Sequence, residues 1–217
     1  MSEKKIITID GPAGAGKSTI AKIAAAHLGL TYIDTGAMYR AVTYKVLKNG
    51  GDFEDTKKII RLAEKSVILL DNGKIFLDGE DVTDKIRTRQ VTNKTSIIAA
   101  LGEVRKVLRD TQRDFSKTQG VVMEGRDIGT VVFPGAKYKF YLDASITERA
   151  RRRYEELRAK GQKVQMEDII TDINKRDNLD FNRGLCPLKI PKGAVVIDST
   201  NKSIEEVADI IVTHAGK

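Results

Sequence analysis

The residues with the clearest chemical potential lie near the N-terminus, in the glycine-rich stretch "GPAGAGKS", residues 11–18. It has the spacing G-x-x-x-x-G-K-[ST], follows the apolar run "KIITID" and precedes the helical pattern "KSTIAKIAAAHLG". Glycines allow backbone angles and close approaches that a Cβ would block, so that successive N–H groups can point at a phosphate. The stretch therefore predicts a phosphate-binding loop between a strand and a helix.

Two side chains in this loop have specific roles. The Lys17 ammonium can reach the β- and γ-phosphates of a nucleoside triphosphate, and the Ser18 hydroxyl can ligate Mg²⁺. We therefore expect ATP as phosphate donor and Mg²⁺ as cofactor. The residues predicted to bind the nucleotide are Gly11, Pro12, Ala13, Gly14, Ala15, Gly16, Lys17, Ser18 and Thr19.

Other classes of phosphate-loop protein fit less well. A GTPase is expected to carry N-K-x-D for guanine, and the stretches that begin at Asn93 and Asn201 lack the Asp. D-x-x-G does not occur in the chain either. A motor or helicase usually needs a larger core than 217 residues provide. A kinase, which needs a second substrate, is the remaining class.

Polar residues that could hold an acceptor follow two other predicted strands. "DTGAMYR" provides Asp34 and Arg40, and "EGRDIGT" provides Arg126 and Asp127. Ligands of α/β sheets bind at the carboxyl ends of the strands. A charged pair bracketed by glycines at a strand end is a good candidate for binding. Arg40, taken alone, is more typical of a solvated helix arginine.

A third group of charges has two open interpretations. In "DINKRDNLDFNR", Asp172, Arg176, Asp180 and Arg183 share one face of a helix. Such spacing is typical of a salt-bridge ladder on the surface. It is also suited to holding a phosphate together with sugar hydroxyls, because arginine makes bidentate contacts with phosphate.

The elements that must position these residues follow from the apolar pattern. Short apolar runs alternate with helical patterns, which predicts an α/β fold with a parallel, doubly wound sheet. The five predicted core strands are "KIITID", "LTYID", "GVVMEG", "KFYLDA" and "AVVIDS". Residues 66–83 predict an antiparallel hairpin around Asn72-Gly73. Residues 148–163 are rich in arginine, and we find no linker that would separate two domains.

The composition limits the other classes of protein. Hydrophobic residues make up 41% and charged residues 31%, which is typical of a globular protein. The net charge of +8 favours a phosphate-rich partner. One cysteine and two histidines exclude an internal disulfide and a Cys/His zinc cluster. We find no signal peptide and no membrane-length apolar run, and we expect a cytoplasmic protein.

The order of these motifs resembles that of the bacterial cytidylate kinase family, whose members phosphorylate CMP and dCMP. The resemblance covers nearly the whole chain and rests on "TIDGPAGAGKST", "DTGAMYR", "GEDVTDKIRT", "EGRDIGTVVFP", "KFYLDAS", "RRYEEL" and "RDNLDFNR". The D-G-F-P-R stretch expected of an adenylate kinase is absent. Some family members have Asp where this chain has Glu124, which retains the charge but changes the reach.

The resemblance implies a single P-loop kinase domain over residues 1–217, with a five-stranded parallel core, a substrate-binding insert at about 63–100 and a helical lid at about 148–166. It implies cytosine contacts from Ser96, Arg105 and Asp127, phosphate contacts from Arg40, Arg126 and Arg183, and pentose contacts from Arg176 and Asp180. Asp34 completes the predicted CMP site. Ser96 and Arg105 rest on the resemblance alone.

The expected reaction is phosphoryl transfer from ATP to CMP or dCMP in pyrimidine nucleotide metabolism. Lys17, Arg126 and Arg183 are the predicted catalytic residues, Ser18 is the predicted metal ligand, and Arg149 or Arg153 of the lid closes over ATP. We expect a monomer without stable nucleic-acid or membrane partners. The alternatives are a P-loop kinase for another small acceptor, such as UMP, or a nucleic-acid-associated regulatory ATPase.

Overall fold

The computed structural model describes residues 4–71, 73–159 and 161–216. It separates into two compact units. Unit 1 consists of Met1–Tyr32 and Gln119–Lys217, and unit 2 consists of Ile33–Thr118. The substrate-binding insert expected at about 63–100 falls within unit 2, and the lid expected at about 148–166 falls within unit 1. The exact boundaries of both remain predictions.

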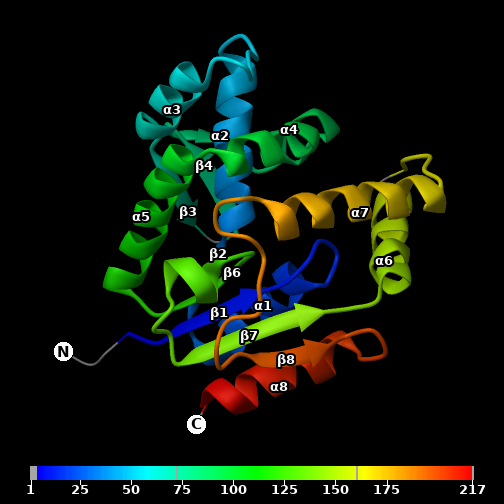
Figure 1. Ribbon diagram of the computed structural model, residues 1–217. Coiled ribbons are helices and arrows are strands. Elements are labelled where there is room, and N and C mark those ends of the chain that lie inside the picture. Colours follow the sequence, from blue (N-terminus) through cyan, green and yellow to red (C-terminus); the bar gives the residue numbers. More distant parts are fainter. Residues whose placement is uncertain (1–3, 72, 160, 217) are drawn as a thin grey trace. The chain divides into compact units, whose positions relative to one another are not determined.

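A five-stranded parallel sheet forms the centre of unit 1 (Figure 1). Its order is β2-β6-β1-β7-β8, with β1 parallel to both β6 and β7, and β7 parallel to β8. The predicted strands and the α/β class are thereby confirmed. The strands are β1 (Ile6–Asp10), β2 (Thr31–Asp34), β6 (Val121–Gly125), β7 (Tyr138–Asp143) and β8 (Val195–Asp198).

The strands are apolar because both faces of the sheet are covered. Ile7 and Ile9 of β1 and Phe140 and Leu142 of β7 are fully buried. Helices α1 and α8 cover the face of the sheet that bears these four residues. Successive residues of β1, from Ile7 to Asp10, and all residues of β6 are buried, so the opposite face is covered too. The short β-branched runs of the sequence therefore reflect burial on two sides. The helices of unit 1 are α1 (Lys17–Leu28), α6 (Ile146–Ala159), α7 (Met166–Asn182), α8 (Ile204–Gly216) and the π-helix η2 (Ile128–Val132).

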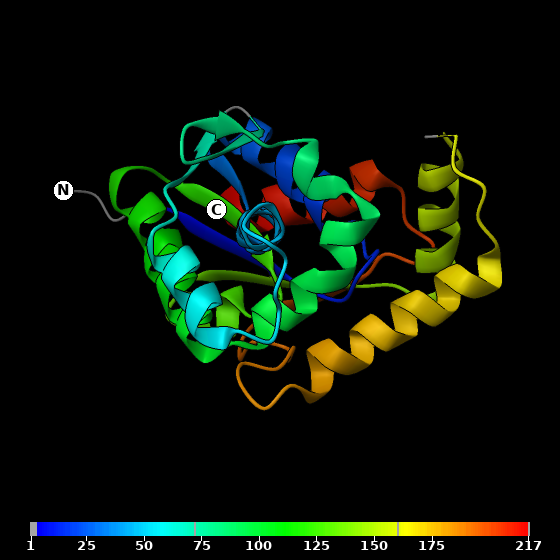
Figure 2. The same ribbon diagram turned by 90° about the horizontal axis from the view of Figure 1, so that it is seen from above.

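Helices α6 and α7 pack against each other at one end of unit 1, as both Figure 1 and Figure 2 show. Their contact is a small apolar cluster of its own, made by Ala150, Ile169 and Ile173 with Tyr154 and Leu157 at its border. The arginine-rich segment is therefore an amphipathic helix. Its apolar stripe faces α7, and most of its charges face solvent.

Unit 2 combines four helices with a small antiparallel sheet of order β3-β4-β5. The predicted hairpin is confirmed in β3 and β4, although Asn72 of its turn lies outside the described residues. The elements are α2 (Thr35–Lys48), α3 (Thr56–Glu64), β3 (Ile68–Asp71), β4 (Lys74–Leu77), β5 (Glu80–Asp81), the 3₁₀-helix η1 (Lys85–Arg87), α4 (Arg89–Ala100) and α5 (Gly102–Thr118).

Local capping fixes where the helices of unit 2 begin. The side chains of Asp34, Asp55 and Thr88 each accept a hydrogen bond from a backbone N–H in the first turn of α2, α3 and α4. Such caps satisfy donors that have no partner inside the helix.

Within the described residues, no helix combines the length and the apolar character needed to cross a membrane.

Candidate functional site

The loop between β1 and α1 has the geometry that its glycines predict. Gly11, Gly14 and Gly16 all have positive φ angles, of 150°, 79° and 88°. A Cβ on Gly11 would lie 2.0 Å from the backbone oxygen of Leu142 on β7, so no side chain fits there. The strand–loop–helix context of a phosphate-binding loop is therefore present, and Lys17 and Ser18 stand at the N-terminus of α1.

Lys17 is buried and folds back over this loop. Its Nζ donates a hydrogen bond to the backbone oxygen of Pro12 at 2.7 Å, and its exposed fraction is 5%. Burial, followed by the positive charges of Arg126 and Arg176, lowers the pKa of Lys17 to about 7, while Glu124 and Asp180 oppose the shift. The positive charges of Arg126 and Arg176 thus act on Lys17 near the loop. Such a cluster of cations is typical of a site that binds an anion.

Glu124 is a site residue whose role was not evident from the sequence. It is the fourth residue of β6, and its Oε1 accepts a hydrogen bond from the Ser18 hydroxyl at 2.6 Å. The Tyr32 hydroxyl donates to the same oxygen at 3.4 Å. Since Ser18 donates its proton to Glu124, the lone pairs of its oxygen remain available. The sequence offered two signals, an acidic residue of "EGRDIGT" near the end of a buried strand and an Asp at this position in some family members, but neither predicted the bond to Ser18.

The residues present fit Mg²⁺ bound together with a nucleotide. Mg²⁺ prefers oxygen ligands and usually keeps several waters and phosphate oxygens, so that the protein needs to supply only one or two ligands. The Ser18 hydroxyl, oriented by Glu124, is such an oxygen. The described residues contain no group of three His, Cys, Asp or Glu side chains that could hold a metal ion by themselves. Ser18 would thus supply one ligand, with nucleotide phosphates and water as the others.

The turn after β6 carries the next group of charges. Arg126 Nε donates to Asp180 Oδ2 on α7 at 2.7 Å, although the two residues are 54 positions apart in the chain. Burial disfavours the charged form of Arg126, but the nearby Asp180 carboxylate outweighs it and raises the pKa. Burial also disfavours the Asp180 carboxylate, and Arg126 again outweighs it, so its pKa is lowered. Both groups are therefore ionised at neutral pH.

Charges at the C-terminal end of α7 contact the turn after β6 instead of forming a ladder along the surface of the helix. Asp180 pairs with Arg126, while Arg183 lies near both Asp180 and Asp127, at 3.7 Å and 3.8 Å. Arg183 Nε also donates to the backbone oxygen of Cys186. Asp172, which shares the helical spacing, is exposed. These contacts favour the second interpretation for Asp180 and Arg183, and their binding of phosphate and sugar stays a prediction.

The two predicted lid arginines differ in their surroundings. Arg149 is buried, and its guanidinium donates to Asp177 on α7 and to the backbone oxygens of Ala13 and Ala144. Asp177 in turn accepts a hydrogen bond from the Ala13 N–H at 3.4 Å. Arg153 is exposed and pairs with Glu156 on its own helix. The structure thus links Arg149, and not Arg153, to the phosphate loop.

Two residues of this region have no signal in the spacing of the sequence. Arg152 donates to the hydroxyl and the backbone oxygen of Ser199, and its Nη1 would lie 3.6 Å from a Cβ on Gly16. Asp177 ends the stretch "NKRD", residues 174–177, which matches the guanine motif N-K-x-D, so the prediction that the chain lacks this motif is wrong. In the structure this stretch lies in the middle of α7, and Asp177 is bonded to Arg149. The match therefore gives no support to guanine binding.

The predicted acceptor residues of unit 2 lie at the end of β2 and on α2, α4 and α5. Asp34 caps α2 through the N–H of Ala37 and pairs with Arg40 at 2.9 Å. Arg105 is buried, donates to the backbone oxygen of Ala99 and stacks over the ring of Tyr39. Ser96 is half-buried on α4. Asp34 and Arg105 therefore have structural contacts, and binding roles for all four acceptor residues remain predictions.

Comparisons with known proteins identify relatives over nearly the whole chain. The sequence model of the family described as cytidylate kinase matches residues 7–217. A cytidylate kinase from Caldanaerobacter subterraneus is 54% identical over 94% of this chain and 91% of its own length. A cytidylate kinase from Desulforamulus reducens is 51% identical over 100% of this chain and 99% of its own length. A crystal structure of an uncharacterized protein from Eubacterium ventriosum, 11% identical, covers 98% of each chain with a TM-score of 0.54, which supports the fold alone.

Proposed function

Because the chain belongs to the cytidylate kinase family, we propose that it transfers the γ-phosphoryl group of ATP to CMP or dCMP, giving ADP and CDP or dCDP. The observation that supports this most directly is the set of charges in unit 1. Lys17 of the phosphate loop is influenced electrostatically by Arg126, Arg176 and Asp180. A kinase must bring two polyanions together, and cations from both the donor loop and the acceptor turn meet that need.

The reaction needs no covalent intermediate and no dedicated base. An oxygen of the CMP phosphate forms a bond to the γ-phosphorus of ATP. The bond from that phosphorus to the oxygen bridging to the β-phosphate breaks, and its electron pair leaves with ADP. The second pKa of a phosphate monoester is about 6, so the attacking oxygen is already ionised at neutral pH. Catalysis then depends on positioning and on stabilising negative charge.

On the donor side, the loop N–H groups and Lys17 bind the phosphates of ATP. Anionic phosphates next to Lys17 stabilise its protonated form, so ATP binding raises a pKa that burial holds at about 7. Ser18 would hold Mg²⁺ together with ATP. When bound, this ion neutralises charge on the β- and γ-phosphates. Glu124 keeps the Ser18 hydroxyl oriented for this role.

On the acceptor side, Arg126 and Arg183 contact the CMP phosphate and stabilise the transferring group. Asp180, which is ionised and bonded to Arg126, accepts from the pentose hydroxyls, and Arg176 assists it. Arg40 is the further phosphate contact assigned by the family. Arginine suits these roles because its planar guanidinium makes paired hydrogen bonds to phosphate.

Base recognition is assigned to Asp127, Ser96 and Arg105, with Asp34 completing the acceptor residues. Cytosine presents an N4 donor and acceptors at N3 and O2. A carboxylate can accept from N4, while a hydroxyl and a guanidinium can donate to the acceptors. Uracil inverts two of these groups and would leave buried polar groups unpaired, so we expect UMP to be a poor acceptor.

The lid contribution comes from α6. Arg149 already contacts the phosphate loop through Ala13, so a small rearrangement of its guanidinium would bring it to ATP. Closure of α6 over ATP would exclude water and limit hydrolysis. We further propose that the protein works as a cytoplasmic monomer, with the substrates as its principal partners.

A panel of acceptors tests the proposed function. ADP release is measured with Mg-ATP and CMP, dCMP, UMP, AMP, GMP or no acceptor. We expect the highest kcat/KM for CMP and dCMP, and little release without an acceptor. Preference for another nucleotide would retain the kinase but overturn the base assignment. ADP release that is the same with and without every acceptor would overturn the kinase.

A further inference from the structure

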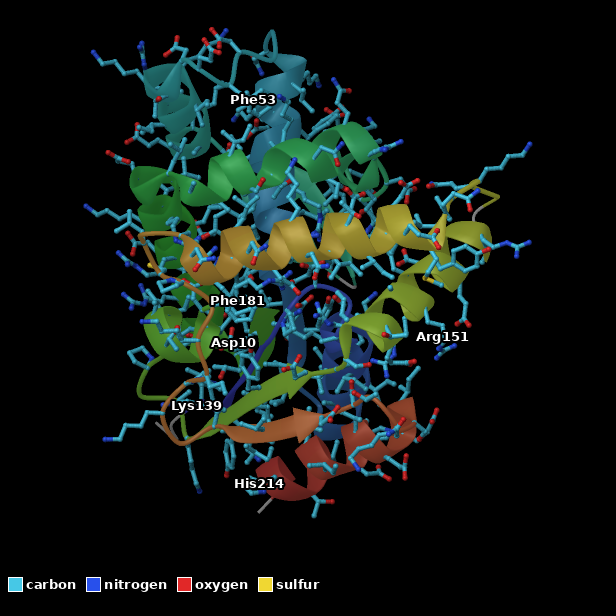
Figure 3. The ribbon with its side chains drawn as sticks, turned by 45° about the vertical axis from the view of Figure 1, so that its right-hand side comes forward. Asp10, Phe53, Lys139, Arg151, Phe181 and His214 are labelled. Atoms are coloured by element: carbon cyan, nitrogen blue, oxygen red, sulfur yellow. The ribbon has the colours of Figure 1, made fainter. Side chains whose placement is uncertain are left out.

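Asp10 is a buried charged residue to which the proposed reaction gives no role. It is the last residue of β1, directly before Gly11 of the phosphate loop, and it is labelled in Figure 3. Its exposed fraction is 0%. A carboxylate at such a place costs free energy unless hydrogen bonds compensate for the lost water. Asp10 therefore depends on donors from neighbouring parts of the chain.

Both carboxylate oxygens accept hydrogen bonds from one short segment that is far away in the chain. Asp10 Oδ1 accepts from the Ile128 N–H at 2.8 Å, and Oδ2 accepts from the Gly129 N–H at 2.7 Å. These are the first two residues of the π-helix η2. The first N–H groups of a helix have no partner inside it. Asp10 therefore caps η2 from a neighbouring strand, 118 and 119 positions away.

The capped helix directly follows the acceptor residues Arg126 and Asp127. The backbone oxygen of Asp127 accepts from the N–H of Val131 at 2.9 Å, so Asp127 itself belongs to the helical turn. The backbone at Gly129 has little freedom, because a Cβ there would lie 2.9 Å from both Thr8 Oγ1 and Pro191 Cγ. The position of this backbone therefore depends on the two bonds to Asp10 and on close packing.

We propose that Asp10 is a positioning residue for the acceptor, which fixes the turn bearing Arg126 and Asp127 by accepting the first two N–H groups of η2. The proposal rests on the proposed function, because the acceptor contacts of that turn come from it. A residue of the donor loop's own strand thus sets the geometry of the acceptor side.

The groups that face Asp10 give this contact a dependence on pH. Burial raises the pKa of Asp10 to about 7, the N–H groups of Gly129 and Ile128 oppose the rise, Asp127 adds to it and Lys17 lowers it. Tyr141 of β7, opposite Asp10 in the sheet, stays neutral because burial raises its pKa to about 12. A protonated carboxyl presents a hydroxyl to one of the two N–H groups. The cap therefore weakens as the pH falls through about 7.

The test compares Asp10→Asn with Asp52→Asn. In the first variant, the side-chain amide would present its NH₂ group to one N–H, as a protonated carboxyl presents its hydroxyl. Asp52 is a matched control, because its carboxylate also accepts two backbone N–H groups, from Glu54 and Asp55, but on the surface of unit 2. Steady-state kinetics are measured separately for CMP and ATP, and circular dichroism with thermal unfolding checks the fold of each variant.

For Asp10→Asn at pH 8, we expect KM for CMP to rise about tenfold, the size typical of losing one hydrogen bond to a charged group. KM for ATP should change far less, and Asp52→Asn should behave as the wild type. An equal rise of both KM values, or no rise for CMP, would overturn the proposal. If the acceptor panel identifies another acceptor, the same comparison is made with that acceptor, so the two failures remain distinguishable.

The pH profile adds a readout that general destabilisation would not move. The CMP phosphate titrates near pH ~6 in both proteins, so the ratio of the variant's KM to the wild-type KM isolates Asp10. We expect this ratio to be large at pH 8 and to approach one at pH 6, where wild-type Asp10 is also neutral. A ratio that is independent of pH would contradict the proposed role.

If Asp10→Asn fails to fold, a measurement on the wild type tests the cap of η2 by Asp10. In nuclear magnetic resonance spectra, the amide protons of Ile128 and Gly129 should shift together with a midpoint near pH 7. The amide proton of Val131, which donates to a backbone oxygen, should shift much less. If the amide protons of Ile128 and Gly129 exchange with solvent as fast as unbonded amides, Asp10 does not hold the turn and the proposal is overturned. If they are protected but titrate no more than that of Val131, the proposed pH dependence is wrong.

Discussion

The ion pairs made within α6 differ from those that join α7 to other segments of unit 1. Arg151, labelled in Figure 3, pairs with Glu148 and Glu155 one turn away on α6, and Arg153 pairs with Glu156. About half of the Arg151 side chain is exposed, at 51%. The pairs Arg126–Asp180 and Arg149–Asp177 instead join different elements, and all four side chains are less than a fifth exposed.

Helical spacing alone therefore does not identify a functional charge. Arginines one turn from a glutamate in water gain little, because solvent screens the pair and the side chains lose entropy. A buried charge must find a partner, because the alternative is an uncompensated charge in a poor solvent. The long-range pairs therefore hold the site together, and the local pairs cover its outer surface.

The largest effect is expected when a buried pair loses one partner. Asp177→Asn leaves the Arg149 guanidinium buried without a countercharge, and we expect the free energy of unfolding to fall by about 3 kcal/mol. Urea denaturation measures the change. Asp172→Asn, an exposed position on the same helix, is the control and should leave stability unchanged.

A double substitution sharpens this prediction. Replacing the pair with apolar residues, Arg149→Met with Asp177→Leu, should restore much of the lost stability, because no charge remains buried. If Asp177→Asn alone unfolds at the wild-type urea concentration, the pair is not a structural link between α6 and α7. The local and long-range pairs would then be alike in their contribution to stability.

The next effect concerns chemistry. Arg126→Lys keeps the charge but loses the planar fork that pairs with Asp180, and we expect kcat with CMP to fall by about 10–100-fold. Single-turnover kinetics separate this loss from product release. Arg61→Lys, at an exposed arginine of α3, is the matched control. A change confined to KM for ATP would remove Arg126 from the transferring group.

The smallest effect is expected on the outer face of α6. Arg151→Ala and Arg153→Ala remove exposed local pairs, so both the midpoint of thermal unfolding and kcat/KM should stay at their wild-type values. The Arg126–Asp180 ion pair should persist when the salt concentration is raised, because dissolved ions screen buried pairs less than exposed ones. A large loss of activity in Arg153→Ala would give Arg153, and not Arg149, the role in the lid.

Much of the fold could be predicted from the sequence. The five parallel strands, the phosphate loop and the hairpin follow from apolar runs, three glycines and a turn signal, all of which are local features. The family, too, was predicted from motifs such as "EGRDIGTVVFP" and "DTGAMYR", and it is confirmed. The order of the strands in the sheet could not be read from spacing, because it depends on which strands pair after the chain has crossed over.

The site could be predicted only in part. Lys17 and Ser18 were evident because the phosphate loop is contiguous in sequence. Glu124 and Asp177 were not, because each acquires its role from a partner far along the chain, Ser18 in one case and Arg149 in the other. The face shared by Asp180 and Arg183 had two interpretations, and the contact of Asp180 with Arg126 excludes only a ladder confined to the surface of the helix.

Short segments of the sequence suffice to predict a loop for phosphate, arginines for a second phosphate and strands that end in acidic residues. These are properties of short segments, in which backbone preference and side-chain type suffice. Only the tertiary structure decided which charges are buried and which groups compensate for them. Asp10 shows the physical reason most clearly, because its carboxylate is buried on one strand and satisfied by two N–H groups that lie 118 and 119 positions away in the chain.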